Sequence, residues 1–328
     1  MTNMLATDSA PALPMIPMLD SRQPMAEELR GAIIAMGNFD GFHLGHQAVV
    51  ARAVEWGRSE GRPVIVATFD PHPMRLFQPD AAPFRLTTLD QRLRLFAGAG
   101  AQAMLVFHFD HALARHSATD FVAMLSGELG AAGVVTGEDF TFGKGRGGSV
   151  AVLKEVGASL GLRSDAVAPV ADESGEVVSS SRIREALKAG DCATATRLLT
   201  RPFAIEGVVM HGDKLGRTID FPTANLEIGH YLRPAYGIYA VRARLPGGVR
   251  VDGVANLGIR PMFDPPKELL EPYFFDFSGD LYGQVIEVEL IARLRGEEKF
   301  DGLEALRHQI ALDCEAARQI LAETPRLP

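Results

Sequence analysis

Short apolar runs, separated by segments with helical spacing, limit what the first half of this chain can fold into. Gly31–Met36 and Pro63–Phe69 have the composition of buried strands, and Gln47–Arg58 between them places its apolar residues at helical intervals. Further strands are predicted at 103–109, 133–137 and near 166–170, with helices beginning near Thr88, Ser117 and Ser149. Strands that alternate with helices form parallel βαβ units, so the pattern predicts a doubly wound α/β domain with a ligand at the carboxyl ends of its strands.

The second half has a different pattern. From about Arg201 onward, short strands broken by Gly and Pro are predicted at 204–210, 237–245, 249–258, 271–277 and 284–294. An amphipathic helix then runs to about Leu321, with Asp301 and Glu304 forming a capping-box signature at its start. We expect a small antiparallel β-barrel with a terminal α-helix. The predicted division is a loose tail over 1–29, an α/β domain over 30–198 and a barrel domain over 199–328. The alternative for the tail is that its Met and Leu residues pack on the body of the protein.

The composition of the chain excludes several classes of binding partner. The 328 residues fit two domains, and the net charge of −8 provides no global positive field for nucleic acid or an anionic membrane. Cys192 and Cys314 are far apart in the sequence, which argues against a disulfide framework or structural zinc and favours the reducing cytosol. No apolar run is long enough to span a bilayer, and the first 20 residues lack the basic segment of a signal peptide. The sequence therefore predicts a cytoplasmic protein with small-molecule substrates, and it leaves a homo-oligomer open.

The strongest local motif is the turn GNFDGFHLGH, which follows the first predicted strand and leads into a helix. Glycines at 37, 41 and 45 allow the backbone to approach a phosphate closely, and the amides at the helix start face that anion. His43 and His46 are three residues apart, so both point to the same side and can donate hydrogen bonds when an α-phosphate is attacked. The alternative is a helix cap with two surface histidines.

A second motif is the hydroxyl-rich run VSSSRIR at 178–184. Its serines can cap a helix and hold phosphate oxygens, while Arg182 or Arg184 can neutralise a leaving pyrophosphate. An ordinary serine-rich helix start remains an equal alternative.

The two motifs together resemble the HxGH and SSTxIR signatures of the nucleotidyltransferase superfamily. The whole chain, from about Gly31 to Leu321, is similar to the bacterial bifunctional riboflavin kinase/FAD synthetase family. The resemblance rests on GNFDGFHLGHQ, TFDPHP, RLTTL, TGEDFTFGKGRGG and VSSSRIREAL in the first half, and on GVVMHGDKLGRTIDFPTANL in the second.

In the first half the resemblance implies that ATP lies across the HxGH turn and the serine run, with the phosphate of FMN as the nucleophile. His43 and His46 are then the catalytic candidates. The ATP- and phosphate-binding candidates are Gly37, Phe39, Asp40, Gly41, Gly45, His72, Asp139, Ser180, Ser181 and Arg184. His72 has an equal alternative as a turn residue held between two prolines, and Asp139 stands where many family members have Asn. Lys144 and Arg146, among glycines, are cations suited to closing over phosphates.

In the second half the resemblance implies a kinase site. Its phosphate-binding candidates are Gly212, Lys214, Gly216 and Arg217, and its metal candidates are Thr223 and Asn225, whose oxygens are hard ligands of the kind that Mg²⁺ prefers. Glu271 occupies the family's catalytic glutamate position, where it can accept the proton of the riboflavin terminal hydroxyl. The alternative is a solvated glutamate on an edge strand. Pro272, which follows it, cannot donate a ladder hydrogen bond and places Glu271 at an edge or a bulge.

The sequence thus predicts two successive activities, phosphorylation of riboflavin to FMN and adenylylation of FMN to FAD. Both use ATP as co-substrate and Mg²⁺ to offset phosphate charge, and flavins are the substrates and products. Two alternatives are a chain in which only one module is active and a flavin- or nucleotide-binding sensor without turnover.

Overall fold

The computed structural model describes residues 15–211, 221–260 and 267–326, and these fall into two compact units. Residues 15–82 and 88–179 make up the first, here called the sheet unit. Residues 83–87 and 180–326 make up the second, here called the barrel unit. Each unit is described by itself. The chain passes from the sheet unit to the barrel unit between Ser179 and Ser180, so the helices that follow the serine run lie in the barrel unit.

The sheet unit is an α/β fold around six parallel strands. The strands are β1 (Met18–Asp20), β2 (Ile33–Met36), β3 (Val64–Asp70), β4 (Ala103–His108), β5 (Gly133–Gly137) and β6 (Arg163–Val167). The helices are α1 (Leu44–Glu60), α2 (Pro73–Phe77), α3 (Leu89–Gly98), α4 (Ala118–Ser126) and α5 (Val150–Ser159), with 3₁₀ turns at Glu27–Leu29, Leu113–Arg115 and Lys144–Arg146. The strand order is β1-β4-β3-β2-β5-β6 and every pair is parallel. The predicted parallel sheet is confirmed.

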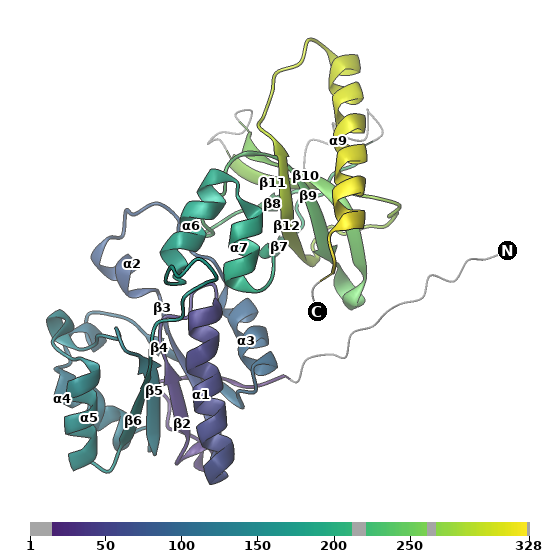
Figure 1. Cartoon of the computed structure of the whole chain (residues 1–328). Coiled ribbons are helices and arrows are strands. Elements are labelled where there is room, and N and C mark those ends of the chain that lie inside the picture. The colour runs from purple at the N-terminus through teal and green to yellow at the C-terminus, as the bar shows by residue number, and fades with distance from the viewer. Residues whose placement is uncertain (1–14, 212–220, 261–266, 327–328) are drawn as a thin grey trace. The chain divides into compact units, whose positions relative to one another are not determined.

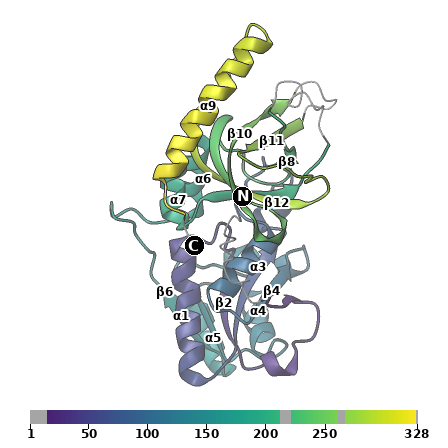
Figure 2. The ribbon, with the colours of Figure 1, turned by 90° about the vertical axis from the view of Figure 1, so that its right-hand side faces the viewer.

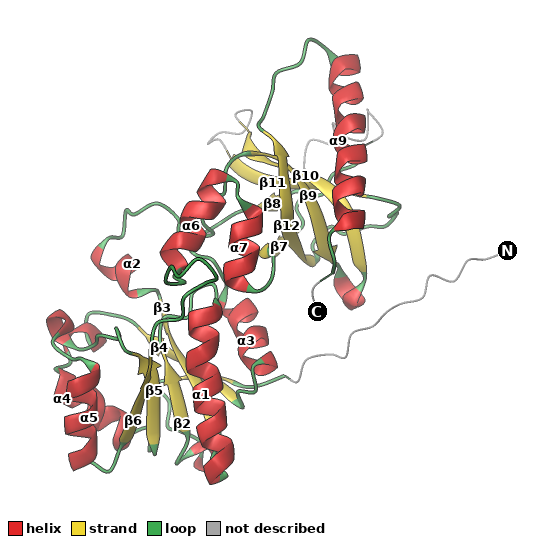
Figure 3. Ribbon diagram, in the orientation of Figure 1, coloured by secondary structure: helices red, strands yellow, loops and turns green. Residues whose placement is uncertain are grey.

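Apolar side chains cover both faces of this sheet. Val50 and Phe96, from α1 and α3, pack on one face together with Ile33, and Phe121 and Leu153, from α4 and α5, pack on the other face. Figures 1 and 3 show these helices on the two sides of the strands. Because both faces are buried, the strands are near-continuous apolar runs, which is why the sequence pattern revealed them.

Local sequence signals account for several boundaries of the sheet unit. Thr88 with Gln91, and Ser117 with Asp120, form the capping boxes that begin α3 and α4, as predicted. One difference concerns the predicted tail, because Met18–Asp20 pairs with β4 as the edge strand of the sheet. A three-residue strand carries too little alternation to be recognised from sequence.

In its described residues, the barrel unit has six antiparallel strands and three helices. The strands are β7 (Phe203–Val208), β8 (Leu226–Glu227), β9 (Gly237–Arg244), β10 (Arg250–Arg260), β11 (Lys267–Phe274) and β12 (Val285–Arg295). The helices are α6 (Ser180–Ala189), α7 (Cys192–Leu199) and α9 (Leu303–Glu323), and a 3₁₀ turn at Pro246–Gly248 joins β9 to β10. The strand order is β7-β12-β9-β10-β11-β8. A bridge between Met210 and Asn225 links the two outer strands, so the barrel is nearly closed, as predicted.

The terminal helix α9 packs on the outer face of the barrel. Ala317 and Leu321 of α9 contact Ala240 and Val254 of β9 and β10, and Figure 2 shows the helix beside these strands. The predicted capping box at Asp301 is wrong, because the residue before the helix is Gly302 and no side chain caps it. With φ of 104°, this position requires a backbone conformation that glycine adopts without strain.

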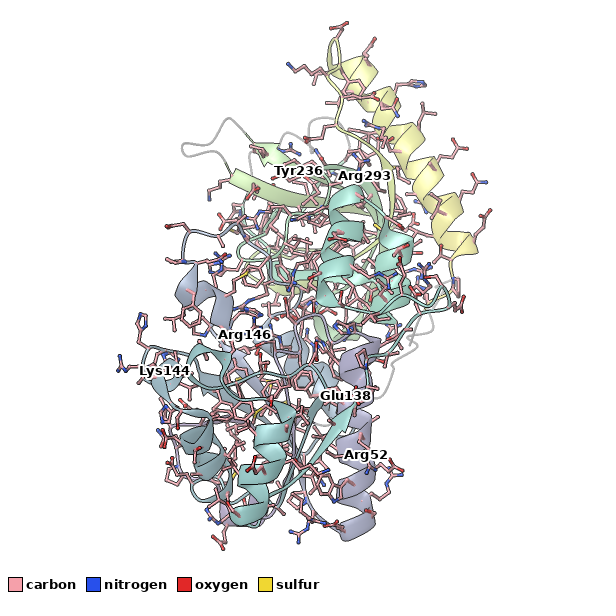
Figure 4. All side chains as sticks on the ribbon, turned by 60° about the vertical axis from the view of Figure 1, so that its left-hand side comes forward. Arg52, Glu138, Lys144, Arg146, Tyr236 and Arg293 are labelled. Atoms are coloured by element: carbon pink, nitrogen blue, oxygen red, sulfur yellow. The ribbon has the colours of Figure 1, made fainter. Side chains whose placement is uncertain are left out.

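Two arginines near the end of β12 bind neighbouring elements of the barrel unit. Arg295 donates to both carboxylate oxygens of Asp313 on α9, at 2.9 and 2.7 Å. Arg293 donates to the carbonyl of Tyr236, and Figure 4 shows these two residues side by side. Among the described residues, no helix has the length and apolar character that crossing a membrane requires.

Candidate active sites

The strand order reverses in the sheet unit between β2 and β5. β2 leads through α1 to β3 on one side, whereas β5 and β6 lie on the other side. In sheets of this kind the ligand binds at such a point, beyond the carboxyl ends of the strands. The HxGH turn follows β2 and Asp139 follows β5, so the structure brings both to this edge. His72 follows β3, the neighbouring strand, at the same edge.

The turn between β2 and α1 is tightly constrained. Phe39 and Phe42 have φ values of 48° and 46°, and Gly41 has 87°, so three of its residues adopt left-handed conformations. Such conformations cost a non-glycine residue about 1–2 kcal/mol each and persist only where the surroundings enforce them. Burial of both phenylalanine rings against Phe96 of α3 supplies part of that enforcement.

The two histidines of the HxGH motif lie face to face. Their ring centroids are 3.6 Å apart with an interplanar angle of 21°, and the edge of Phe39 contacts the His46 ring. His43 is the N-cap residue of α1 and is 5% exposed. The alternative of two surface histidines is therefore wrong for His43. The stacked imidazoles form a pair of potential hydrogen-bond donors at the start of a helix, beside the amides that attract an anion.

A buried arginine forms an ion pair with the turn between β2 and α1. Arg92 of α3 lies 3.2 Å from the carboxylate of Asp40, and their side chains are 2% and 3% exposed. Its other terminal nitrogen donates to the hydroxyl of Thr68 at 3.1 Å, and that hydroxyl donates to the carbonyl of Asn38 at 2.8 Å. Asp40, predicted as a phosphate-binding residue, thus has its carboxylate engaged by an arginine inside the protein.

The centre of the motif is also close to the chain that precedes the serine run. A Cβ atom added at Gly45 would lie 3.3 Å from the His43 ring and 3.7 Å from the carbonyl oxygen of Val178. Glycine at this position therefore lets the main chain at Val178 pass the first turn of α1. Ser180, Ser181 and Arg184 belong to α6 of the barrel unit, where Arg184 donates to the carbonyl of Phe84 at 2.9 Å.

The remaining candidates of the sheet unit are at loop positions. His72 caps α2, with its Nδ1 accepting from the amide of Met74 at 3.2 Å, so any proton of the neutral ring is on Nε2. Lys144 and Arg146 are exposed on a loop that is closed by hydrogen bonds between Phe142 and Gly148. Figure 4 shows both cations at the periphery of the unit.

In the barrel unit, Glu271 lies on β11 and its side chain is 18% exposed. It is not a solvated glutamate, because Arg260 of β10 donates to its Oε2 through Nε at 2.6 Å and also through Nη2. Nη1 of Arg260 also lies 3.4 Å from Oε1 of Glu297. The guanidinium thus has two carboxylates, those of Glu271 and Glu297, beside it. Burial is the largest single influence and lowers the pKa of Arg260, but the hydrogen bonds that Arg260 donates to Glu271, together with the charges of Glu271 and Glu297, outweigh it, so the pKa is raised overall.

Pro272 is accommodated without a bulge. The register between β10 and β11 is continuous, with Ala255 opposite Pro272 and Asn256 opposite Glu271. The carbonyl of Pro272 accepts a hydrogen bond from Ala224 at 2.9 Å, so the nitrogen that lacks a proton faces the segment before β8, not β10. Neither predicted environment, an edge or a bulge, is observed, because β11 lies between β10 and the segment that leads into β8.

The same hydrogen bond brings the PTAN motif beside Glu271. Ala224 lies between the two metal candidates, Thr223 and Asn225, and Asn225 is 8% exposed. Thr223 and Asn225 therefore flank β11 on the side opposite β10. Gly212, Lys214, Gly216 and Arg217 fall outside the described residues.

Sequence reasoning missed four residues of these sites: Arg92, Asn256, Arg260 and Glu297. A signal existed for two of them, since Arg92 interrupts the apolar face of α3, and Asn256 is a polar residue within an apolar strand. Arg260 and Glu297 come together only through the barrel, so no local pattern could have linked them.

The folds and motifs define a class of protein: a nucleotide-type α/β module joined to a small barrel module, each with its own group-transfer site. Comparisons with known proteins agree. The family described as FAD synthetase matches residues 25–182, and the family described as riboflavin kinase matches residues 199–321. The chain belongs to the bifunctional riboflavin kinase/FMN adenylyltransferase family.

Relatives with that name match most of the chain. The Escherichia coli (strain K12) protein is 39% identical over 90% of this chain and 94% of its own length, and the Bacillus subtilis (strain 168) protein is 36% identical over 89% and 93%. A crystal structure from Streptococcus pneumoniae, described as a macrolide-efflux protein, is 30% identical with a TM-score of 0.82 over 92% of this chain and 99% of that one.

Proposed function

We propose that the chain makes FAD from riboflavin in two ATP-dependent reactions, with residues 199–328 phosphorylating riboflavin and residues 30–198 adenylylating FMN. One observation carries the proposal: both characteristic sites occur in a single chain. The stacked His43 and His46 follow β2 at the reversal of strand order, and Glu271 lies beside the PTAN segment of the barrel.

In the adenylylation, a phosphate oxygen of FMN attacks the α-phosphorus of ATP. A new P–O bond forms, the bond to the bridging oxygen breaks, and pyrophosphate leaves. His43 and His46 donate hydrogen bonds to oxygens that gain charge as this occurs, and the amides of the first turn of α1 add to them. Gly37, Gly41 and Gly45 keep the backbone open to the phosphates.

In the phosphorylation, Glu271 accepts the proton of the riboflavin terminal hydroxyl as its oxygen attacks the γ-phosphorus. The bond from that phosphorus to the bridging oxygen breaks, and ADP leaves. Arg260 fixes the carboxylate through Oε2, which leaves Oε1 as the oxygen that takes the proton. We assign Lys214 and Arg217 to the phosphates of ATP on the strength of the sequence motif alone.

The residues present fit a magnesium ion. Among the described residues, no cluster of three His, Cys, Asp or Glu side chains is arranged to hold a metal. Mg²⁺ commonly binds with one or two protein oxygens besides substrate phosphates and water. The Thr223 hydroxyl and the Asn225 amide oxygen would hold it beside Glu271, and the ion would offset phosphate charge.

The cysteines agree with the predicted cytosolic location. Burial raises the pKa of Cys192 to about 12 and that of Cys314 to about 11, so neither thiol is activated for redox chemistry at neutral pH. We propose that the protein acts on small-molecule substrates in the reducing cytosol.

The test is a time course of the purified chain with riboflavin, ATP and Mg²⁺, in which flavins are separated by chromatography. FMN should appear first and FAD second. Glu271→Gln should lower FMN formation by about 10²–10⁴-fold and leave FAD formation from added FMN intact. His46→Ala should do the reverse, with FMN accumulating and FAD formation reduced by about 10²–10³-fold.

Each alternative predicts a different outcome. A chain with one active module yields FMN alone, or converts only added FMN. A flavin- or nucleotide-binding sensor binds ligand but releases neither ADP nor pyrophosphate. Either result contradicts the proposal.

A further inference from the structure

Asn256 faces the proposed catalytic glutamate across two paired strands. It stands opposite Glu271 in the register of β10 and β11. The amide of Phe275 donates to the carbonyl of Asp252, and hydrogen-bonded pairs alternate along an antiparallel ladder, so Asn256 and Glu271 form a hydrogen-bonded pair with Cα atoms about 5.5 Å apart. Directly opposed residues have side chains on the same face of the sheet. The amide and the carboxylate are therefore neighbours.

The amide oxygen of Asn256 has no donor among the described residues. Its Oδ1 is buried, and no group in the described part of the chain donates a hydrogen bond to it. Buried polar atoms in folded proteins nearly always have a partner, so an acceptor without one beside a catalytic carboxylate indicates a group that binds there. That group must carry a hydrogen-bond donor.

The charged neighbours limit what that donor is. Arg260 engages Oε2 of Glu271 and contacts Glu297, and a Cβ at Gly258 would collide with the Glu297 carboxylate. Glu297 thus covers the strand face next to Asn256. With Arg260 already held by two carboxylates, Asn256 Oδ1 and Glu271 Oε1 form two acceptors side by side. Two adjacent acceptors match two adjacent hydroxyls, each of which has one proton to donate.

We propose that Asn256 binds the hydroxyl next to the one that is phosphorylated, so that the site recognises the terminal 1,2-diol of the riboflavin side chain. This inference rests on the proposed role of Glu271. During the reaction Glu271 takes the proton of the terminal hydroxyl, whose oxygen bonds to the γ-phosphorus as ADP leaves. The neighbouring hydroxyl keeps its proton and its hydrogen bond to Asn256. Because Oδ1 is buried, the side chain of Glu297 moves aside when substrate enters, while Arg260 stays on Oε2 of Glu271.

The experiment combines a change in the protein with a change in the substrate, using the full-length chain. Wild type and Asn256→Ala are each assayed with riboflavin and with 4′-deoxyriboflavin, which lacks the neighbouring hydroxyl. Asn256→Ala should lower kcat/KM for riboflavin by about 10- to 100-fold, as expected for losing a hydrogen bond from a specific site. The analogue should lower kcat/KM of the wild type by a similar factor. The variant should then turn over both substrates equally, to within about twofold.

Two controls separate this role from a structural one. Because Oδ1 accepts no hydrogen bond from any described residue, Asn256→Ala should leave the melting temperature unchanged, and FAD formation from FMN should remain at the wild-type rate. Lys267→Ala is the matched surface variant. Lys267 lies on β11 four residues from Glu271, with a side chain 41% exposed and paired with Glu227, and its loss should not distinguish the two substrates.

The outcomes are distinct for each claim. If wild type phosphorylates riboflavin and Asn256→Ala does so equally well, the assignment of Asn256 is overturned while the proposed function stands. The same holds if the variant loses equal activity with both substrates. If wild type forms no FMN at all, the proposed function itself has failed.

Discussion

Replacing Arg92 by methionine tests whether a buried ion pair holds the HxGH turn. Methionine keeps the length of the side chain but leaves the Asp40 carboxylate, 3% exposed, without its charge partner. Removing one partner of a buried pair costs about 3–5 kcal/mol, because the remaining charge is buried uncompensated. It also removes the donor to Thr68, which connects to the carbonyl of Asn38. A loss of this size is a large share of the 5–15 kcal/mol by which domains are usually stable.

The assay exploits the only tryptophan of the chain. Trp56 lies on α1, so its fluorescence reports unfolding of the sheet unit specifically. With a urea dependence of about 2 kcal/mol per molar, the loss lowers the unfolding midpoint by about 1.5–2.5 M. Adding Asp40→Asn to Arg92→Met removes the stranded charge and should recover part of the midpoint. FAD formation should fall in Arg92→Met, whereas FMN formation, which depends on the barrel unit, should persist.

Two results would refute this reasoning. A midpoint shift below about 0.5 M would mean that the pair contributes little beyond its desolvation cost. A double variant no more stable than Arg92→Met would mean that the stranded carboxylate is not the source of the loss.

Three further predictions concern individual contacts. Gly45→Ala should maintain or raise the melting temperature, since alanine stabilises a helix relative to glycine by up to about 1 kcal/mol. The variant should nevertheless form FAD more slowly, because the new Cβ displaces the His43 ring. An unchanged rate of FAD formation would contradict this prediction. Burial, and then a neighbouring glutamate, raise the pKa of Glu289, so its contribution to stability is present at low pH and lost as pH rises through the folded-state pKa. Glu289→Gln should therefore raise the melting temperature at pH 8 and change it little at pH 4. A variant that is stabilised at pH 4 and not at pH 8 would show that the pKa of Glu289 is shifted in the other direction. Asp313→Ala should lower the free energy of unfolding by about 1–3 kcal/mol, because it removes the carboxylate that pairs with Arg295. Limited proteolysis should then cleave α9 from the barrel earlier than in wild type.

Much of the fold was predictable because local and tertiary preferences agree. The β2 and β3 strands are apolar on both faces, and the capping boxes at Thr88 and Ser117 mark their helices without ambiguity. In the barrel, Tyr239 and Ala240 are both fully buried although they point to opposite faces, because α9 covers the outer one. A strand with one solvent-facing side would alternate buried and exposed residues, but β9 is buried on both sides.

The sites were predictable to the extent that motifs carry them. HxGH and PTAN are contiguous in sequence, and each fixes its own local geometry. The partners of these motifs are not contiguous: Asp40 meets Arg92 across 52 residues, and Arg260 meets Glu297 across 37. Such contacts depend on sheet order and strand register, which no single segment encodes. The short helix α7 was missed because its eight residues span barely two turns.

The short segment 83–87 has a consequence for synthesis of the chain. It lies within the first half of the sequence, yet Arg85 forms backbone hydrogen bonds with His230 and Leu232 of the barrel unit. These partners are translated about 150 residues later, or roughly 7–30 s at 5–20 residues per second. The sheet unit flanks the segment on both sides and is complete at residue 179. A nascent chain therefore emerges with one finished module and a segment at 83–87 that lacks its partners in the barrel unit, and a ribosome stalled between residues 179 and 230 should expose this segment to protease.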